Sequence, residues 1–406
     1  MTNDSVASAP PAFGVRPLEG VRVISLEHAI AAPFCSRQLA DLGAEVIKVE
    51  RPGTGDFARH YDRRTRGLAS HFVWTNRSKK SLTLDVKAPE GAGVLFELLG
   101  DADVLIQNLS PGASARLGLS FEALHERFPR LIVCDISGYG SDGPYAHKKA
   151  YDLLIQSESG LLSQTGTPET PVKAGVSISD IAAGMYAYSN ILAALLARSR
   201  SGLGSHIDVS MLEATVEWMG YPLYYALDGA EPPPRAGASH STIYPYGPFP
   251  AGDGQSVMLG LQNEREWALF CEHVLKRPAL VDDVRFATNA ARSEARQALD
   301  GVIDEVFSGL SADDIVARLD QAGIANAHVN DMADVWAHPQ LAARGRWCEI
   351  ASPVGPLPAL LPPGQGQAFD PCMGAIPALG EHTREILVSL GHDDTTIKGW
   401  RERGVV

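Results

Sequence analysis

Cysteine is scarce in this sequence, and its spacing excludes two common kinds of site. The 406 residues include five cysteines, which lie far apart and form no C-x-x-C pair. A disulfide framework needs an even, closely spaced set, and a structural zinc site needs paired ligands. We therefore expect neither a disulfide scaffold nor a bound metal.

Positive charge is also limited. The sequence has 35 Lys and Arg residues against 48 Asp and Glu residues, a formal charge of -13. Because proteins that bind nucleic acid need a basic surface to neutralise phosphates, we expect no nucleic-acid partner. The densest basic stretches, 63–66 and 77–80, lie in one N-terminal region, where a local anion site is compatible with the overall charge.

The sequence also lacks a long apolar run and a secretion signal. Its longest central apolar run, Ile191–Ala197, is much shorter than the roughly 20 residues of a membrane span. The first residues contain no basic segment followed by an apolar one, which is the pattern of a signal peptide. We expect a disordered polar tail at 1–17, no membrane association and a cytoplasmic location.

Several motifs of large enzyme families are missing. There is no G-x-x-x-x-G-K-[ST], no G-x-S-x-G and no H-E-x-x-H, which excludes P-loop proteins, α/β-hydrolases and zincins. The connection after the first predicted strand, 27–34, contains no glycine, although a dinucleotide-binding turn needs glycine to approach the pyrophosphate. We therefore expect no permanently bound cofactor.

The first half does contain a series of short apolar runs rich in β-branched residues. They lack polar alternation, as strands buried on both faces of a parallel sheet do. The runs are Val21–Leu26, Ala44–Glu50, Ala102–Asn108 and Leu131–Ser137. With a crossover helix at 88–100, a long helix at 180–199 and a strand at 206–212, they predict a large α/β domain at 18–218 with a Rossmann-like parallel sheet.

The second half has a different character. A helix predicted at 213–227 leads into a segment rich in Pro and Gly, and we expect a linker at 219–255. A smaller α+β domain is predicted at 256–337 from two strands and three helices, which are 256–261, 263–275, 293–307, a helix opened by the capping signal at Ser311, and 324–329. We expect the remaining segment, 338–406, to return to the large domain.

Seven strings of sequence together resemble the class III CoA-transferase family, also called the CaiB/BaiF family. The strings occur in order at Gly20–Asp56, Asn76–Lys87, Ala102–Gly112, Lys148–Leu161, Ser177–Ala187, Ala337–Gly345 and Leu379–Leu387. The resemblance extends from about Pro17 to Val406. It implies an enzyme that uses CoA or acyl-CoA as a substrate together with a small carboxylic acid, and a homodimer of two interlocked chains.

The resemblance implies that Asp180 is the covalent nucleophile. Asp180 would form an aspartyl-acyl mixed anhydride and then an aspartyl-CoA thioester. Asp180 lies at the start of the predicted helix, where backbone N–H groups and the helix dipole should keep its carboxylate ionised and lower its pKa. The alternative interpretation of the residue pattern alone is an ordinary N-cap aspartate.

The same resemblance implies a set of CoA contacts. They are the loop residues His28, Ala29, Ile30 and Ala31, together with Arg51, Asn108, Leu109, Lys149 and Tyr151. Arg51 and Lys149 are suited to the pyrophosphate or ribose phosphate of CoA. Their alternative interpretation is as solvated surface charges.

The family also contains α-methylacyl-CoA racemases, which use a histidine as one of two bases. This sequence has Tyr151 at that place, and a phenol with a reference pKa of ~10 is a poor base near neutral pH. Transfer of CoA is therefore favoured over racemisation. A CoA-binding protein without turnover is a further alternative.

The linker sequence bears on the substrate. Segment 235–247 lacks the run of glycines found in formyl-CoA:oxalate members and, with 259–267, resembles members that act on C4 and C5 dicarboxylic acids: itaconate, mesaconate, citramalate and succinate. An intramolecular C1–C4 transfer within mesaconyl-CoA is an alternative. We expect His240, Tyr244 and Tyr246 to hold the second carboxylate, although the two tyrosines also suit a simple packing role.

Overall fold

The computed structural model describes residues 14–364 and 368–406, which form two compact units. The large domain comprises the described residues up to Ser159, together with Gly175–Trp218 and Ala343–Val406. The small domain comprises Gly160–Ala174 and Met219–Ala342. Segment 160–174 and the expected linker at 219–255 are therefore parts of the small domain. Of the expected tail at 1–17, all but 14–17 lies outside the described residues.

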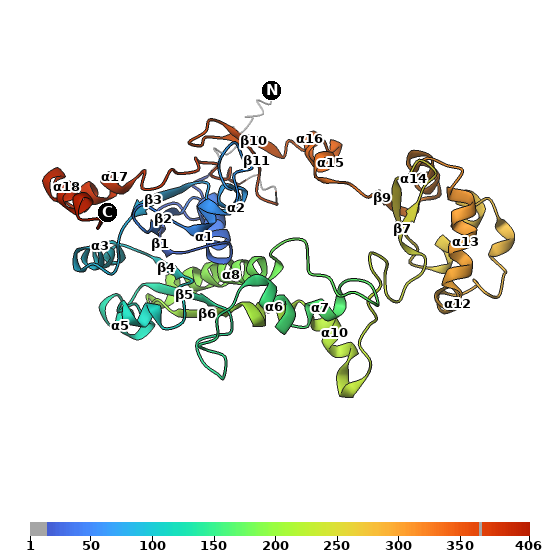
Figure 1. Ribbon diagram of the computed structural model, residues 1–406, viewed down its shortest axis with the longest axis horizontal. Coiled ribbons are helices and arrows are strands. Elements are labelled where there is room, and N and C mark those ends of the chain that lie inside the picture. Colours follow the sequence, from blue (N-terminus) through green and yellow to red (C-terminus); the bar gives the residue numbers. More distant parts are fainter. Residues whose placement is uncertain (1–13, 365–367) are drawn as a thin grey trace, which may run out of the picture. The chain divides into compact units, whose positions relative to one another are not determined.

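The large domain is built on a six-stranded parallel sheet with the order β3-β2-β1-β4-β5-β6 (Figure 1). The order reverses between β1 and β4, as in a doubly wound sheet. The strands are β1 (Arg22–Leu26), β2 (Glu45–Glu50), β3 (Lys79–Thr83), β4 (Val104–Gln107), β5 (Ile132–Ser137) and β6 (His206–Ser210). Five of them confirm the prediction, whereas β3 begins with two lysines and has no apolar pattern.

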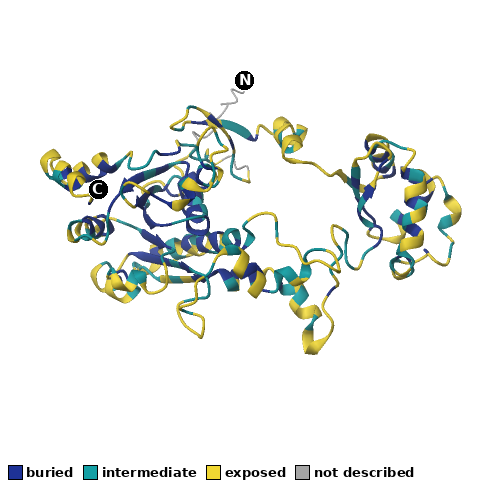
Figure 2. Cartoon of the chain, viewed as in Figure 1, coloured by how far each residue is buried: buried dark blue, intermediate teal, exposed yellow. Residues whose placement is uncertain are grey.

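Helices cover both faces of this sheet. On one face, α1 (Ala31–Asp41) and α8 (Ile178–Ser201) share a buried apolar cluster with the strands. On the other face a second cluster includes residues of α3 (Pro89–Gly100), α5 (Phe121–Arg127), α17 (Thr383–Ser389) and α18 (Asp394–Glu402). Figure 2 shows the buried residues, in dark blue, along the strands and the sheet-facing sides of the helices. The C-terminal helices thus pack on the large domain.

Helix α8 is long and apolar enough to cross a membrane by length and composition alone, and it is the one such helix among the described residues. A core helix of an α/β domain meets the same criteria. In α8 the side chains of Ala182, Ala183, Ala187 and Ile191 are fully buried in the cluster shared with α1. The sequence predicts this helix at 180–199, but its uninterrupted apolar runs are too short to indicate a membrane span, because small and polar residues are interspersed along it.

A glycine lets α1 and α8 approach closely. A Cβ atom added at Gly184 of α8 would lie 2.7 Å from the backbone oxygen of Ala31 and 3.1 Å from the ring of Phe34. Such contacts are too short for any side chain, so the hydrogen of glycine is what fits between the two helices. The first turn of α1 is therefore held against the first turns of α8.

The small domain contains a three-stranded antiparallel sheet, with the order β7-β8-β9. Its helices follow the predicted order, and α14 starts with a capping box in which Ser311 and Asp314 bond reciprocally, as the sequence indicates. The elements are β7 (Tyr246–Pro250), β8 (Ser256–Gly260), α11 (Glu264–Leu269), a π-turn (Phe270–Val274), α12 (Asn289–Glu294), α13 (Arg296–Phe307), α14 (Ala312–Ala322) and β9 (Ala325–His328).

Strand β7 lies where the sequence predicts only an extended linker. Its sequence includes Pro248 and Pro250, which cannot donate to a neighbouring strand. Because β7 is an edge strand that pairs on one side with β8, prolines are compatible with it. The prediction of an unstructured linker is wrong at these residues.

Other differences concern short elements. The helix predicted at 213–227 is broken into α9 (Met211–Glu217) and α10 (Gly220–Tyr225), and a hairpin of β10 (Trp347–Ile350) and β11 (Leu357–Leu360) lies in the C-terminal segment. The remaining α-helices are α2 (Ser70–Thr75), α4 (Ala113–Arg116), α6 (Asp152–Glu158), α7 (Leu161–Gln164), α15 (Met332–Trp336) and α16 (Pro339–Ala343).

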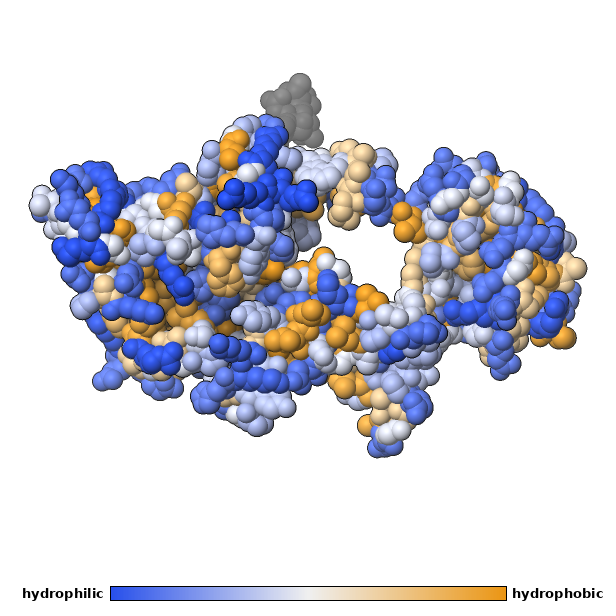
Figure 3. All heavy atoms as spheres, viewed as in Figure 1, coloured by the Kyte–Doolittle hydropathy of each residue, from blue (hydrophilic) through white to orange (hydrophobic). Residues whose placement is uncertain are grey.

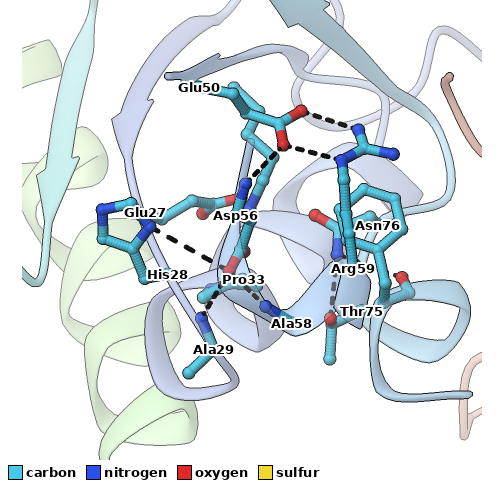
Figure 4. A network of polar contacts seen from close by, with 12 residues as sticks. Glu27, His28, Ala29, Pro33, Glu50, Asp56, Ala58, Arg59, Thr75 and Asn76 are labelled. Carbon is cyan, nitrogen blue, oxygen red and sulfur yellow. Dashed lines mark hydrogen bonds and ion pairs between the residues drawn. The ribbon is translucent and has the colours of Figure 1, made fainter. Parts of the chain in front are cut away.

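A network of buried charges joins β1, β2 and β3, and Figure 4 labels Glu27, Glu50 and Asp56 of this region. Glu27 directly follows β1, and its carboxylate accepts hydrogen bonds from Lys79 Nζ at 2.7 Å and Lys48 Nζ at 3.2 Å. Lys48 also lies 2.7 Å from Asp56, and all four side chains are buried. Burial raises the pKa of Glu27, but the two lysines outweigh it and hold that pKa at about 2.

We expect Lys48→Met to lower the free energy of unfolding by about 3–5 kcal/mol, because it leaves the Asp56 carboxylate buried without its cation. Urea unfolding at pH 7 measures this difference. Lys398→Met is the control, since the Lys398 side chain is 79% exposed and its loss should change stability by less than about 0.5 kcal/mol. Equal stability of the two variants would contradict a stabilising role for the network.

Candidate active site

Asp180 lies beside the N-terminus of a neighbouring helix. It is the third residue of α8 and is half-buried. The backbone N–H of Ala31, the first residue of α1, lies close enough to the carboxylate to lower its pKa. The close approach of α1 and α8 at Gly184 therefore directs the positive end of the α1 dipole at Asp180.

The N-terminus of α8 itself is capped by a different carboxylate. Oδ1 of Asp152 accepts hydrogen bonds from the backbone N–H groups of Ser179 at 2.8 Å and Asp180 at 3.2 Å. Oδ2 of Asp152 accepts a bond from Gln156 Nε2 at 2.6 Å, within the same helix α6. Asp152 thus occupies the N–H groups that an N-cap aspartate would use, so Asp180 does not have the ordinary capping role.

These surroundings raise the pKa of Asp180 to about 7. Burial contributes most, the negative charge of Asp152 adds to it, and the N–H of Ala31 opposes both. The prediction of a lowered pKa is wrong, because burial disfavours the ionised carboxylate, and because Asp152 takes the free N–H groups of α8 and places a second negative charge beside Asp180. Both the protonated and the ionised form of Asp180 are then populated near neutral pH.

The loop between β1 and α1 is held from both sides. Ala29 has a left-handed φ of 61°, and its N–H donates to Asp56 Oδ1 at 3.1 Å. The side chain of Asn108 accepts from His28 N–H at 2.9 Å and donates to the His28 carbonyl at 2.8 Å. Because alanine disfavours the left-handed region, the loop conformation depends on these bonds and on the buried network around Asp56 (Figure 4).

Aromatic side chains lie next to this loop, and the sequence analysis did not identify them. His28 stacks on Phe57 with 5.4 Å between ring centroids, and Phe57 lies 5.8 Å from Tyr61. Both Phe57 and Tyr61 are 47% exposed. Burial, with the charges of Asp56 and Asp180, raises the pKa of Tyr61 to about 12, so its phenol is protonated near Asp180. Phe57 and Tyr61 closely follow Gly20–Asp56, the first segment that resembles the family, and this position was the signal in the sequence that could have identified them.

The remaining expected CoA contacts differ in their surroundings. Arg51 and Lys149 are exposed, and the Tyr151 side chain is 70% exposed at the start of α6. Leu109 is half-buried and its N–H donates to Gln107 Oε1 at 2.8 Å, whereas Ile30 is buried. The structure thus places the loop residues, Asn108 and Asp180 in one region of the large domain.

In the small domain, His240 and Tyr246 form a stacked pair with 5.2 Å between ring centroids and 10° between planes. Nδ1 of His240 accepts from the N–H groups of Thr242 and Ile243, each at 3.1 Å. An acceptor nitrogen carries no proton, so the neutral ring has its hydrogen on Nε2. His240 can therefore donate one hydrogen bond through Nε2.

Tyr244 is placed differently. Its side chain is 2% exposed in the core of the small domain, and its hydroxyl donates to Asp300. The guanidinium of Arg296 lies 4.4 Å from its ring centroid. The phenol hydrogen is already used, so the geometry gives Tyr244 the packing role that the sequence also allows. No group of three or more His, Cys, Asp or Glu residues suited to a metal ion occurs in the described residues.

Comparison with known proteins identifies the family of this chain. Residues 18–383 match the family described as CoA-transferase family III. The chain is 34% identical over 418 residues to an acyl-CoA transferase of Fusarium pseudograminearum, covering 100% of this chain and 91% of that protein. It is 35% identical over 398 residues to the succinyl-CoA:glutarate CoA-transferase of Homo sapiens, covering 97% and 90%.

A solved structure shows the same fold. It is the crystal structure of a CAIB/BAIF family protein from Brucella suis, with a TM-score of 0.84 and 34% sequence identity. The match covers 93% of this chain and 100% of that one. The resemblance inferred from the seven strings is confirmed, and the chain belongs to CoA-transferase family III.

Proposed function

We propose that this protein moves CoA from an acyl-CoA to a small carboxylic acid with Asp180 as the covalent nucleophile. The observation that carries the proposal is the position of Asp180, a half-buried carboxylate that lies beside the first N–H of α1 and makes no helix cap of its own. A carboxylate so placed is reactive, and the helix dipole beside it stabilises added negative charge.

The reaction proceeds through two covalent intermediates on Asp180. An Asp180 oxygen attacks the thioester carbonyl, the C–S bond breaks, and CoA thiolate leaves with an aspartyl-acyl anhydride behind it. The thiolate then attacks the Asp180 carbonyl carbon and releases the donor acid, which leaves an aspartyl-CoA thioester. The acceptor carboxylate repeats the steps in reverse. The N–H of Ala31 and the protonated phenol of Tyr61 lie near Asp180 and are the donors proposed to stabilise the charge that develops there.

CoA would bind at the carboxyl ends of β1 and β4. Loop 28–31 follows β1, and Asn108 and Leu109 follow β4, so both flank the point at which the strand order reverses. Open α/β sheets bind ligands at such points. Arg51 and Lys149 are the exposed cations proposed for the phosphates, and Asn108 acts by holding His28 in place.

The proposed acceptors are small dicarboxylic acids of four or five carbons. The relative from Homo sapiens is named for succinyl-CoA and glutarate, and the linker sequence independently resembles members that use such acids. His240 is the proposed donor to the second carboxylate, because its Nε2 hydrogen is not used by the backbone bonds that occupy Nδ1.

We also propose a homodimer. Several large apolar side chains are exposed on α6, α8 and α10, including Leu154 at 49%, Leu196 at 60% and Tyr224 at 80%, and Figure 3 shows apolar areas, in orange, on the face in view. A second copy would remove such surface from water. Light scattering on a size-exclusion column should return twice the chain mass, and a value equal to one chain would contradict this proposal.

Asp180→Asn and Asp180→Ala should lower CoA transfer by at least about a thousandfold, since each removes the nucleophile. The assay uses succinyl-CoA with glutarate and follows both CoA esters by mass spectrometry. Asp180→Asn should also be at least as stable as the native protein at pH 8, because a carboxyl whose pKa is raised on folding lowers stability once it ionises. Near-native turnover in pure Asp180→Ala protein would refute the mechanism.

Asp152→Asn should move the acid limb of the kcat profile to lower pH. The asparagine oxygen still accepts the α8 N–H groups, but the negative charge that helps raise the pKa of Asp180 is gone. Asp180 then ionises at lower pH, and the variant keeps more of its maximal rate at pH 6. Asp101→Asn, at a side chain that is 77% exposed, is the matched control. An acid limb at the same pH in the native protein and in both variants would contradict the electrostatic coupling between Asp152 and Asp180.

His240→Ala should reduce kcat/KM for glutarate or succinate by roughly ten- to a hundredfold, because a hydrogen bond to a charged group contributes about 1.5–3 kcal/mol. Butyrate, which has no second carboxylate, should be a poor acceptor whose rate barely changes. Tyr244→Phe is a test of stability and not of acceptor binding, since the hydroxyl that it removes bonds to Asp300. An equal loss for butyrate and glutarate in His240→Ala would assign His240 a structural role.

A further inference from the structure

The small domain contains a pocket to which no role has been given above. Its volume is about 390 Å³, within the range of about 300–1,000 Å³ that is typical of small-molecule sites. All of its lining residues belong to the small domain. They are Thr167, Pro168, Pro234, Arg235, Ala236, Gly237, Ser241, Ser293 and Arg296.

The lining is positively charged although the protein is acidic overall. It includes two arginines and no Asp or Glu, against a formal charge of -13 for the whole sequence. The hydrogen bonds that Arg235 and Arg296 make with the described part of the chain go to backbone carbonyl oxygens. Asp300 lies one helical turn after Arg296 on α13, but it bonds to Tyr244 and forms no ion pair with Arg296 within 4 Å. A carbonyl dipole does not cancel a full charge, so both guanidinium groups can attract an anion.

Arg235 builds one wall of the pocket. Its Nε donates to the carbonyl of Thr167 at 2.8 Å, and its Nη2 donates to the carbonyl of Pro168 at 2.7 Å. The N–H of Gly237 donates to the carbonyl of Gly166 at 2.8 Å. These bonds tie segment 163–168 to the linker, so this wall is formed before any ligand binds.

Arg296 supplies the opposite side. Its guanidinium lies 4.4 Å from the ring centroid of Tyr244, and Nη2 donates to the His240 carbonyl at 3.2 Å. The cation–π contact holds the guanidinium against the tyrosine ring. The His240 bond uses one of five N–H donors, which leaves others for a ligand.

A hydroxyl group without a hydrogen-bond partner belongs to one of the lining residues of this pocket. Ser293 lies three residues before Arg296, and its Oγ is buried with no hydrogen-bond partner among the described residues. Buried polar atoms are nearly always bonded, so an orphan hydroxyl in a pocket wall is a marker of a ligand or ion. The Oγ atom is closed to solvent in this conformation, so the side chain would rotate about its Cα–Cβ bond to donate to an anionic oxygen that Arg296 holds.

We propose that this pocket binds the carboxylate of a short-chain organic acid, with Arg296 providing the charge and Ser293 a hydrogen bond. Guanidinium groups and hydroxyl groups are the donors that carboxylates prefer. The apolar side chains of Pro168, Pro234 and Ala236 line the same space and suit a short carbon chain, which inorganic phosphate lacks. The binding does not depend on the transfer mechanism proposed above.

Calorimetric titration of the full-length, CoA-free protein with glutarate tests this, in a buffer without carboxylate or phosphate. Arg296→Gln should weaken binding roughly ten- to a hundredfold and Ser293→Ala about tenfold. Because Ser293 Oγ has no bond within the described chain to lose, Ser293→Ala should leave the unfolding temperature unchanged. Arg265→Gln, at an exposed arginine outside the lining, should bind glutarate like the native protein.

Three results would overturn the proposal: no heat of binding, native affinity in both pocket variants, or tighter binding of phosphate than of glutarate. Transfer kinetics identify the source of the acid. If Arg296→Gln raises the KM for the acceptor and leaves kcat unchanged, the pocket binds the acceptor itself. If KM is unchanged but the variant no longer responds to added acids that are not acceptors, the pocket binds a second acid molecule. Intact glutarate binding without any CoA transfer would refute the proposed function and leave the pocket standing.

Discussion

The proposed chemistry depends on one close contact, between the backbone of Ala31 at the start of α1 and Gly184 on α8. Gly184 lies four residues after Asp180, about one helical turn, and any side chain there would collide with the Ala31 carbonyl. The N–H of the same Ala31 lies beside the Asp180 carboxylate and lowers its pKa. The packing of two helices in the core of the large domain therefore determines what the nucleophile contacts.

Burial and the charge of Asp152 raise the pKa of Asp180, whereas the N–H of Ala31 lowers it. The balance between these effects was not visible in the sequence. The family resemblance identified the residue, and its place at a helix start suggested a lowered pKa. The structure shows that Asp152, 28 residues earlier, takes the helix N–H groups and adds a like charge. Tertiary packing brings both Tyr61 and Asp152 beside Asp180, and the spacing of these residues along the sequence does not reveal it. A carboxylate with a pKa near neutrality suits a nucleophile that is both ionised and basic.

The fold was predictable wherever burial leaves a pattern in the sequence. Strands buried on both faces are apolar throughout, and helix α14 has its capping box, so these elements were found. Strand β3 was missed because the partner that makes the buried Lys79 acceptable, Glu27, lies 52 residues away in sequence. Strand β7 was missed because Pro248 and Pro250 suit only an edge position, which depends on the assembled sheet.

The central claim is that CoA becomes covalently attached to Asp180. The most direct measurement is peptide mapping by mass spectrometry after incubation with succinyl-CoA, without an acceptor acid, and rapid acid quenching. The account predicts that CoA is joined through a thioester to the peptide that contains Asp180, and that the adduct disappears when glutarate is added before the quench. An adduct on another residue such as Asp152, or transfer that proceeds with no adduct at any time, would contradict it.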